Sequence, residues 1–543
     1  MISSAQNFVN PILAGFYPDP SICRAGNDYY IVTSSFAYFP GLPVFHSKDL
    51  LNWQQVGAAL NRPEQLNLDG AGVSRGLFAP SIAYHKGVFY IVCTLVDNGG
   101  NFVITAADPK GPWSQPVWLP EIDGIDPSIF FDENDRTWIV YNSNPPENKS
   151  AYDGHRTIRT NELDIKQLKI ISENKIIVNG GTDITKKPIW IEAPHLLKKD
   201  GWYYLICAEG GTGYDHSEVV FRSKSVDGPF VPYEKNPILS QRHLDPARKN
   251  PITTAGHADM VETPDGKWFA VFLACRPYEG DYYNIGRETF MAPVQWKDGW
   301  PIINPDHAMI QYTYPIISTV DKAIERLNGN YLFKDDFKTN KLSPRYSFLR
   351  TVRENWYNVD KGNLTLKLRP QTCSGKENPS FVGFRQPHLK GHASTAIWFA
   401  ATASNEKAGL LVFQSEQHYY FLCQSLANGK PVVQLYKGTG NKSNATAAIL
   451  MTSMAVKLKK DNELLLKITA NGDTYSFFYA TQPSDWKLLK ANADAKFLST
   501  KEAGGFVGCM YAMYATSDGL PTNAQASYHW FECMNEDDVY KLP

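Results

Sequence analysis

A short segment with one carboxylate recurs along the N-terminal part of this 543-residue chain. Its first copy is Phe16-Tyr17-Pro18-Asp19-Pro20-Ser21-Ile22, and Asp126-Pro127-Ser128-Ile129 repeats the second half of it. The frame returns, with the acid changed or moved, in Phe78-Ala79-Pro80-Ser81-Ile82 and Glu192-Ala193-Pro194-His195-Leu196. A looser fifth copy is Gly256-His257-Ala258-Asp259-Met260. Three of the five copies therefore carry an acid at, or next to, the same point of the repeat.

Each copy is followed by a turn and then by a run of aromatic and aliphatic residues, such as Tyr29-Tyr30-Ile31-Val32. The copies are spaced by roughly 45 to 70 residues, which is typical of propeller blades built from several short strands. Five copies predict a five-bladed β-propeller. The innermost strands of all blades line one central axis, so equivalent residues converge there. The repeat thus predicts that Asp19, Asp126 and Glu192 face one another at one mouth of the axis.

The pattern changes after the fifth copy. Alternating apolar and polar strands, such as Leu364-Thr365-Leu366-Lys367-Leu368, are separated by Gly/Asn turns in the C-terminal part. This pattern predicts a β-sandwich, jelly-roll-like. We therefore expect an all-β chain with a propeller over residues 1–318, a linker over 319–334 and a sandwich over 335–543.

Composition excludes several classes of protein. The net charge is −1, and no basic block is present, so the electrostatic footprint of a nucleic-acid binder is missing. No apolar run approaches the roughly 18 residues of a membrane span. The eight cysteines are scattered singly, which favours buried free thiols over disulfides. The first residues lack the pattern of a signal peptide; we expect a bacterial protein, periplasmic if a leader has been removed and cytoplasmic otherwise.

Three carboxylates in one concave site need an explanation, because burial and mutual repulsion both oppose their ionisation. One Asp-Pro alone is ordinary turn chemistry, and the acids could also cap turns or hold a cation at the axis. Three acids in register across repeats favour general acid/base catalysis, in which carboxyls with different pKa values divide the work.

The segments around these acids, Tyr17-Pro18-Asp19-Pro20, Gly124-Ile125-Asp126-Pro127 and Ile191-Glu192-Ala193-Pro194-His195, resemble the three signature segments of glycoside hydrolase family 43. That family contains β-xylosidases and α-L-arabinofuranosidases. The resemblance implies that Asp19 is the general base, that Glu192 is the general acid, and that Asp126 orients the acid and raises its pKa. It also implies inversion of the anomeric centre, with base and acid ~6.5–9.5 Å apart.

The resemblance extends to other candidate residues. His257 matches a family histidine near the axis that often ligates calcium or an ordered water, although a simple hydrogen-bonded core histidine is equally plausible. Arg287 matches an arginine that reaches sugar hydroxyls, although a salt bridge between blades is the alternative. Phe36 and Phe39 match an aromatic wall of the sugar pocket. Phe78 stands where many xylosidases of the family have tryptophan, which weakens the case for strict xylosidase specificity.

The leading hypothesis is an inverting exo-glycosidase that releases terminal α-L-arabinofuranose from plant hemicellulose side chains or oligosaccharides of arabinoxylan or xyloglucan type. A β-D-xylosidase acting on xylo-oligosaccharides, or a bifunctional enzyme, is the close alternative. A carbohydrate-binding protein with an inert propeller is the non-enzyme alternative. We expect no organic cofactor, since Glu209-Gly210-Gly211-Thr212-Gly213 lacks the lysine and the helix of a phosphate loop. The one inorganic candidate is a structural calcium ion at the propeller axis.

Overall fold

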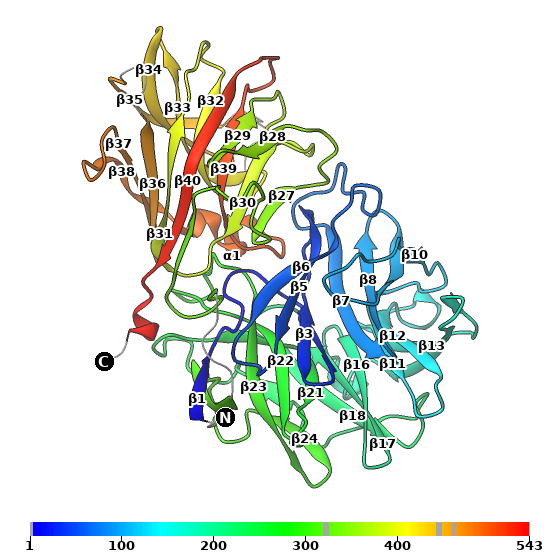
Figure 1. Ribbon diagram of the computed structural model, residues 1–543. Coiled ribbons are helices and arrows are strands. Elements are labelled where there is room, and N and C mark those ends of the chain that lie inside the picture. Colours follow the sequence, from blue (N-terminus) through cyan, green and yellow to red (C-terminus); the bar gives the residue numbers. More distant parts are fainter. Residues whose placement is uncertain (1–3, 319–324, 441–447, 459–462, 542–543) are drawn as a thin grey trace.

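The computed structural model describes residues 4–318, 325–440, 448–458 and 463–541. Within them the regular structure is almost entirely strand, with one short helix, α1 (Thr500–Ala503), and four 3-10 turns, η1 to η4. Figure 1 shows two bodies side by side, a ring of small sheets and a pair of larger sheets. The predicted all-β fold, a five-bladed propeller followed by a β-sandwich, is confirmed.

Five sheets form the blades, each written here from the axis outward. Blade I contains β2 (Ser21–Ala25), β3 (Asp28–Val32), β5 (Gly41–Ser47) and β6 (Gln54–Leu60). Blade II contains β7 (Gly76–His85), β8 (Val88–Val96), β9 (Gly100–Ala106) and β10 (Val117–Trp118). Blade III contains β11 (Ile125–Phe131), β12 (Thr137–Ser143) and β13 (Thr157–Asp164), with β14 (Lys169–Ile170) and β15 (Lys175–Asn179) at its edge.

Blade IV contains β16 (Glu192–Lys199), β17 (Trp202–Glu209) and β18 (Ser217–Ser223), with β19 (Val231–Pro232) and β20 (Leu239–Ser240) outside them. Blade V contains β21 (Thr253–Glu262), β22 (Trp268–Cys275), β23 (Glu288–Lys297) and β24 (Trp300–Ile303). A separate pair, β1 (Ser4–Val9) with β25 (Thr313–Ser318), joins the two ends of this part of the chain.

No blade combines described strands from the two ends of the propeller, so contacts between the first and last blades close the ring. Strand β2 contacts β21, as each other innermost strand contacts its neighbours. At this junction one carboxylate oxygen of Asp259 accepts hydrogen bonds from the Ser21 hydroxyl at 2.7 Å and the Ile22 N–H at 2.9 Å. Asp259 therefore links the last blade to the first, beside the backbone bridge between Leu13 and Thr289.

Every innermost strand carries the same irregularity at the recurring segment. In blades II to V the strand contains one extra residue relative to its partner, between Phe78 and Ser81 and at the three equivalent places. Blade I follows the same path, because Ser34 N–H bonds to Pro18 and regular pairing resumes at Ser21. The bulged residue has a left-handed backbone in all five copies: Asp19, Ala79, Asp126, Ala193 and His257. A β-bulge of this kind redirects a side chain, here toward the propeller axis.

The sandwich consists of two eight-stranded sheets. One contains β26 (Leu332–Asp335), β28 (Tyr357–Asp360), β29 (Asn363–Lys367), β31 (Lys390–Trp398), β36 (Leu464–Asn471), β37 (Thr474–Ala480), β38 (Lys487–Asp494) and β40 (Gln525–Asn535). The other contains β27 (Tyr346–Leu349), β30 (Ser380–Arg385), β32 (Lys407–Ser415), β33 (His418–Ala427), β34 (Lys430–Lys437), β35 (Ile449–Ala455), β39 (Met510–Thr516) and β4 (Tyr38–Phe39). Strand β4 comes from the propeller part of the chain, so the two bodies share a sheet.

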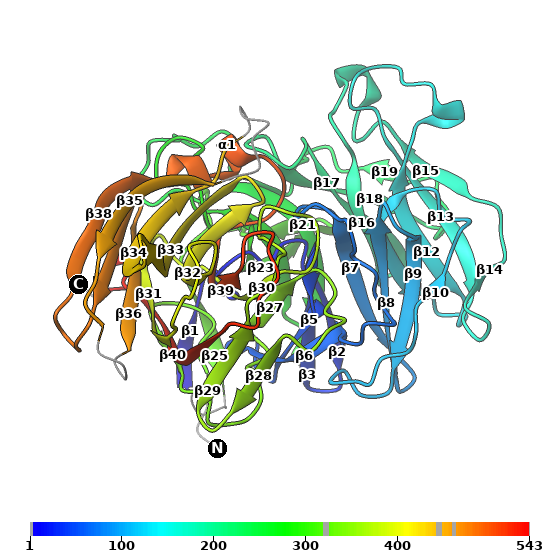
Figure 2. The same cartoon turned by 90° about the horizontal axis from the view of Figure 1, so that it is seen from above.

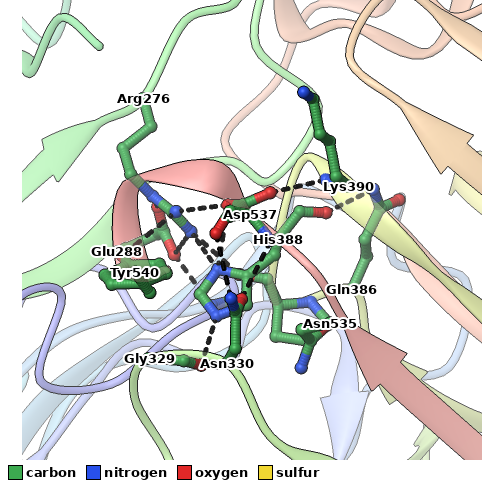
Figure 3. Close-up of polar contacts among 12 residues, drawn as sticks. Arg276, Glu288, Gly329, Asn330, Gln386, His388, Lys390, Asn535, Asp537 and Tyr540 are labelled. Carbon is green, nitrogen blue, oxygen red and sulfur yellow. Dashed lines mark hydrogen bonds and ion pairs between the residues drawn. The ribbon is translucent and has the colours of Figure 1, made fainter. Parts of the chain in front are cut away.

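Buried polar groups also join the two bodies. Arg276, which follows β22, bonds to Glu288 of the same blade at 2.6 and 2.9 Å and to Asp537, which follows the last sandwich strand, at 3.0 Å (Figure 3). Its guanidinium also contacts Nδ1 of His388 at 2.9 Å, while Nε2 of His388 faces the Gly329 carbonyl at 2.7 Å. This His388 nitrogen therefore carries the proton and Nδ1 accepts. The burial lowers the pKa of His388 to about 4, so the ring is neutral.

Other expectations can be placed on this fold. The first part of the predicted linker, residues 319–324, lies outside the described residues, and the sandwich begins with β26 at Leu332 rather than at residue 335. All eight cysteines are buried and free, as expected. In the described ranges, none of the helical segments has the length and apolarity to cross a membrane.

We predict that Asp259→Ala lowers the stability of the propeller, because the buried Ser21 hydroxyl and Ile22 N–H lose their acceptor. The expected loss is about 1–3 kcal/mol, measured as a lower midpoint of thermal unfolding. Asp265→Ala, on the exposed turn after β21, is the matched control and should stay within about 0.5 kcal/mol of the parent protein. Equal midpoints for the two variants would show that Asp259 does not hold the ring closed.

Candidate active site

A cavity of about 210 Å³ lies over the five bulges. That is smaller than the ~300–1,000 Å³ of sites for drug-sized ligands and suits a single sugar ring. The bulges form its floor: the bulged residues of blades I, II, III and V line the cavity, and in blade IV Glu192 lines it instead of the bulged Ala193. The lining residues are Asp19, Phe36, Phe78, Ala79, Ile125, Asp126, Asn142, Arg156, Trp190, Glu192, Thr212, His257, Arg287 and Phe506. The structure thus brings together all three predicted acids.

Asp19 stands in a positive environment. Its Oδ1 accepts a hydrogen bond from Arg287 at 2.9 Å, and its Oδ2 accepts one from the Ser34 hydroxyl at 2.5 Å. Burial alone would raise the pKa of Asp19, but the Arg287 charge and the Ser34 hydrogen bond outweigh it and lower the pKa below its usual value. Asp19 is therefore ionised at neutral pH, which is the state that a general base requires.

Asp126 and Glu192 form a second, more apolar group. Burial, followed by the charge of Asp19, raises the pKa of Asp126, and burial, followed by the charge of Asp126, raises the pKa of Glu192. The Asp126 carboxylate accepts hydrogen bonds from the Asn142 amide at 3.0 Å and the Ala193 N–H at 3.3 Å. Because these donors favour the ionised form of Asp126, the proton that the pair retains lies on Glu192.

The predicted aromatic wall is only partly as expected. Phe36 and Phe78 line the cavity, with ring centroids 5.4 Å apart. Phe39 does not: it lies in β4, pairs with Phe348 and packs in the hydrophobic core that joins the two bodies. The prediction that Phe39 belongs to the aromatic wall of the pocket is therefore wrong, because its pairing with the sandwich strand turns the side chain away from the cavity. Phe506, which precedes β39, takes its place against Phe36 and Phe78.

Arg287 and His257 both reach the cavity. Arg287 donates to the Thr212 hydroxyl at 3.1 Å and forms an ion pair with Asp19 at 2.9 Å, so it lines the cavity and at the same time makes a salt bridge between blades V and I. His257 Nδ1 lies 3.6 Å from Asp19 Oδ1, and burial lowers the pKa of His257 to about 3, so its ring is neutral.

A calcium ion is not supported by the side chains near His257. Calcium takes six to eight oxygen ligands. In the part of the chain that the structure describes, no group of three or more His, Cys, Asp or Glu side chains could hold a metal ion. The calcium expectation stays a prediction, and the chemistry below is derived from side chains alone.

Several lining residues were not predicted from the sequence. Asn142 lies in β12 and pairs with Ile125, the neighbour of Asp126, and Thr212 lies in the glycine-rich loop after β17, where its hydroxyl meets Arg287. Arg156 comes from the polar run Tyr152–Ile158, which therefore reaches the mouth of the cavity. Trp190 stands two residues before Glu192, and its proximity to that acid was the available signal. Phe506 had none, since it is remote in sequence from every blade.

An ionised carboxylate and a protonated one, facing a cavity of one-sugar size on a five-bladed propeller, define the class of glycosidases that work with two carboxyls. Comparison with known proteins agrees. Residues 8–301 match the model of glycosyl hydrolases family 43, and residues 334–534 match the β-xylosidase C-terminal concanavalin A-like domain. The chain belongs to glycoside hydrolase family 43.

The relatives differ in the activity that their names state. A xylosidase/arabinosidase of Butyrivibrio fibrisolvens is 39% identical over 96% of this chain and 98% of its own. A non-reducing end α-L-arabinofuranosidase of Bacteroides ovatus is 36% identical over 98% and 96%. Among solved structures, a family 43 protein from a capybara gut metagenome is 39% identical, with a TM-score of 0.88 over 94% of this chain and 95% of that chain.

We predict that Arg287→Gln moves the acidic limb of the kcat/KM profile to higher pH. Loss of the positive charge raises the pKa of Asp19, so the base becomes protonated at a higher pH; the expected shift is about one unit or more. Arg222→Gln, whose guanidinium lies over Trp202 and Trp300 rather than in the cavity, controls for loss of charge. An unmoved acidic limb in Arg287→Gln would mean that Asp19 is not the group that titrates.

Proposed function

We propose that this protein is an inverting exo-glycosidase that removes a terminal α-L-arabinofuranose unit from hemicellulose side chains or their oligosaccharides. Asp19 takes a proton from a water molecule as that water attacks the anomeric carbon. Glu192 gives its proton to the glycosidic oxygen as the bond to the anomeric carbon breaks. One carboxyl gains the proton that the other loses, so the cycle is completed by proton exchange with solvent.

The observation that carries this proposal is the opposite direction of the two pKa shifts. The arginine beside Asp19 lowers its pKa, whereas burial and the charge of Asp126 raise that of Glu192. Pairs of titratable groups whose environments separate their pKa values identify the acid and the base. For an inverting reaction we expect the two carboxyls to stand ~6.5–9.5 Å apart, which leaves room for the attacking water.

The exo mode is supported by the way the cavity is bounded. Phe506 comes from the sandwich and covers one side, with its ring 5.6 Å from that of Phe78. Its backbone N–H bonds to the Ser74 hydroxyl of the propeller at 2.9 Å, which fixes it there. A wall of this kind obstructs the passage of a polymer, which favours a chain end as the substrate.

Arabinofuranose is favoured as the released sugar by Phe78, which leaves more room than the tryptophan of many xylosidases, and by the name of the Bacteroides ovatus relative. A β-D-xylosidase or a bifunctional enzyme is the second candidate, favoured by the name of the Butyrivibrio fibrisolvens relative. Plant-derived oligosaccharides are the expected partners in both cases. The bacterial origin and the periplasmic or cytoplasmic location stay predictions.

The first test is kcat/KM on an aryl α-L-arabinofuranoside beside an aryl β-D-xyloside. We expect the arabinofuranoside to be preferred by tenfold or more. Asp19→Asn and Glu192→Gln should each lose about 10²–10⁴-fold, because each removes a general acid or base. Preference for the xyloside would overturn the choice of sugar but not the mechanism. If the parent protein cleaves neither substrate faster than Asp19→Asn does, the mechanism is overturned and the carbohydrate-binding alternative is favoured.

We predict that Asp126→Asn moves the alkaline limb of the pH profile to lower pH. Activity falls as Glu192 loses its proton, so this limb follows the raised pKa of Glu192. Removing the charge of Asp126 removes one of the causes that raise this pKa. The measurement is kcat/KM between pH 5 and 9. Asp123→Asn, whose carboxylate contacts Ser143 and Arg159 outside the lining of the cavity, should leave the alkaline limb in place.

A further inference from the structure

Trp190 adopts a backbone conformation that a bulky residue rarely takes. Its φ is +44°, in the left-handed region, where non-glycine residues with large side chains are genuine outliers. Strained residues of this kind persist only where the surrounding structure fixes them, and they concentrate at binding and catalytic sites. Trp190 is not one of the bulged residues on the floor of the cavity; it lies in the loop before β16, two residues ahead of Glu192. Its conformation therefore needs its own explanation.

Neighbouring loops hold this conformation. The Trp190 N–H bonds to the Gly154 carbonyl at 2.9 Å, and the Ile189 carbonyl accepts from the Gly210 N–H at 2.8 Å. Two glycines with positive φ make room: a Cβ on Gly211 would lie 3.3 Å from Cε3 of Trp190, and one on Gly154 would lie 3.2 Å from the Ile189 side chain. The loops between β12 and β13 and between β15 and β16 project beyond the blades at this end of the propeller (Figure 2). They present Trp190 rather than bury it.

The position of Trp190 relative to the acid is the second observation. It lines the cavity two residues before Glu192, yet it is 40% exposed. Arg156 lines the cavity on the same side, and its charge acts on Glu192. Among the residues that the structure describes, no carboxylate pairs with Arg156; its guanidinium bonds only to the adjacent His155 carbonyl, at 3.2 Å. An exposed indole and an unpaired guanidinium thus flank the carboxyl that donates the proton.

We propose that Trp190 and Arg156 form the subsite for the leaving group, which is the pyranose unit of the oligosaccharide from which the terminal sugar is removed. This inference rests on the proposed function. Glu192 protonates the oxygen that joins the two sugars, so the groups beside Glu192 at the mouth face the second sugar. The C–H face of a pyranose packs on the indole, and the guanidinium donates hydrogen bonds to its hydroxyls. Tryptophan and arginine are the residues enriched where binding energy concentrates.

The test compares two substrates that share the terminal sugar. One is an oligosaccharide that carries it on a main chain of pyranose units, and the other is its methyl glycoside, which has almost no leaving group to bind. We expect Trp190→Ala to lower the ratio of kcat/KM values, oligosaccharide to methyl glycoside, by about tenfold, mainly through a higher KM for the oligosaccharide. Trp190→Phe should restore most of the ratio because it keeps an aromatic face. Arg156→Gln should lower it as well.

Trp398→Ala is the matched control, since Trp398 is 52% exposed and lies on the sandwich. It should leave the ratio unchanged. If Trp190→Ala lowers both kcat/KM values equally, or lowers the thermal midpoint without changing the ratio, Trp190 only packs the loops and the inference is wrong.

Calorimetric binding of an unbranched pyranose oligosaccharide separates this inference from the proposed function. Binding by the parent protein that is lost in Trp190→Ala supports the subsite even where neither substrate is cleaved. Absence of cleavage then counts against the proposed reaction alone. Equal binding by the parent protein and Trp190→Ala overturns the subsite.

Discussion

The active site depends on one backbone constraint, the left-handed residue at the bulge of the recurring segment in each blade. A regular strand alternates its side chains, and neither Asp19 nor Asp126 could then face the axis while the apolar residues after it remain in the core. The extra residue of the bulge resolves this conflict, and it does so in all five blades. Left-handed φ costs free energy for a non-glycine residue. Packing of the blades against one another maintains it, so the fold and the position of the acids are inseparable.

The carboxyls have different pKa values because their neighbours differ, although the repeat places them in equivalent positions. Asp19 and Asp126 occupy equivalent positions, but only Asp19 lies beside a cation. Arg287 is 268 residues away in sequence and reaches Asp19 because blade V closes against blade I. Asp126 receives only neutral donors, from Asn142 and from the Ala193 N–H. The contact between blades V and I therefore places a positive charge beside Asp19, which makes this carboxyl a base, whereas Glu192 of blade IV retains its proton.

The repeat made the blades and the three acids predictable, because a propeller converts a position in the repeat into a position at the axis. It also indicated that Glu192 is displaced, which the structure explains: the bulged residue in blade IV is Ala193, and the acid precedes it. Phe39 was misplaced because no local signal shows that residues 38–39 pair with a sandwich strand. Phe506 and Trp190 could not be predicted from repeats, since one comes from the other body and the other depends on loops that differ between blades.

The sandwich is part of the site rather than an appended module, and buried arginines fix its orientation. Arg385 of the sandwich donates to the Phe16 carbonyl at 2.9 Å and lies over the rings of Phe16 and Tyr17, in the segment that leads to Asp19. Arg350 pairs with Glu416 and bonds to the Ala71 carbonyl, which places the loop whose Ser74 holds Phe506. A buried charge is tolerated only where its partners are in place, and a displaced sandwich would remove the Phe16 and Ala71 carbonyl acceptors from these guanidiniums. That requirement selects one arrangement of the two bodies, and with it the distance at which Phe506 closes the cavity over Asp19.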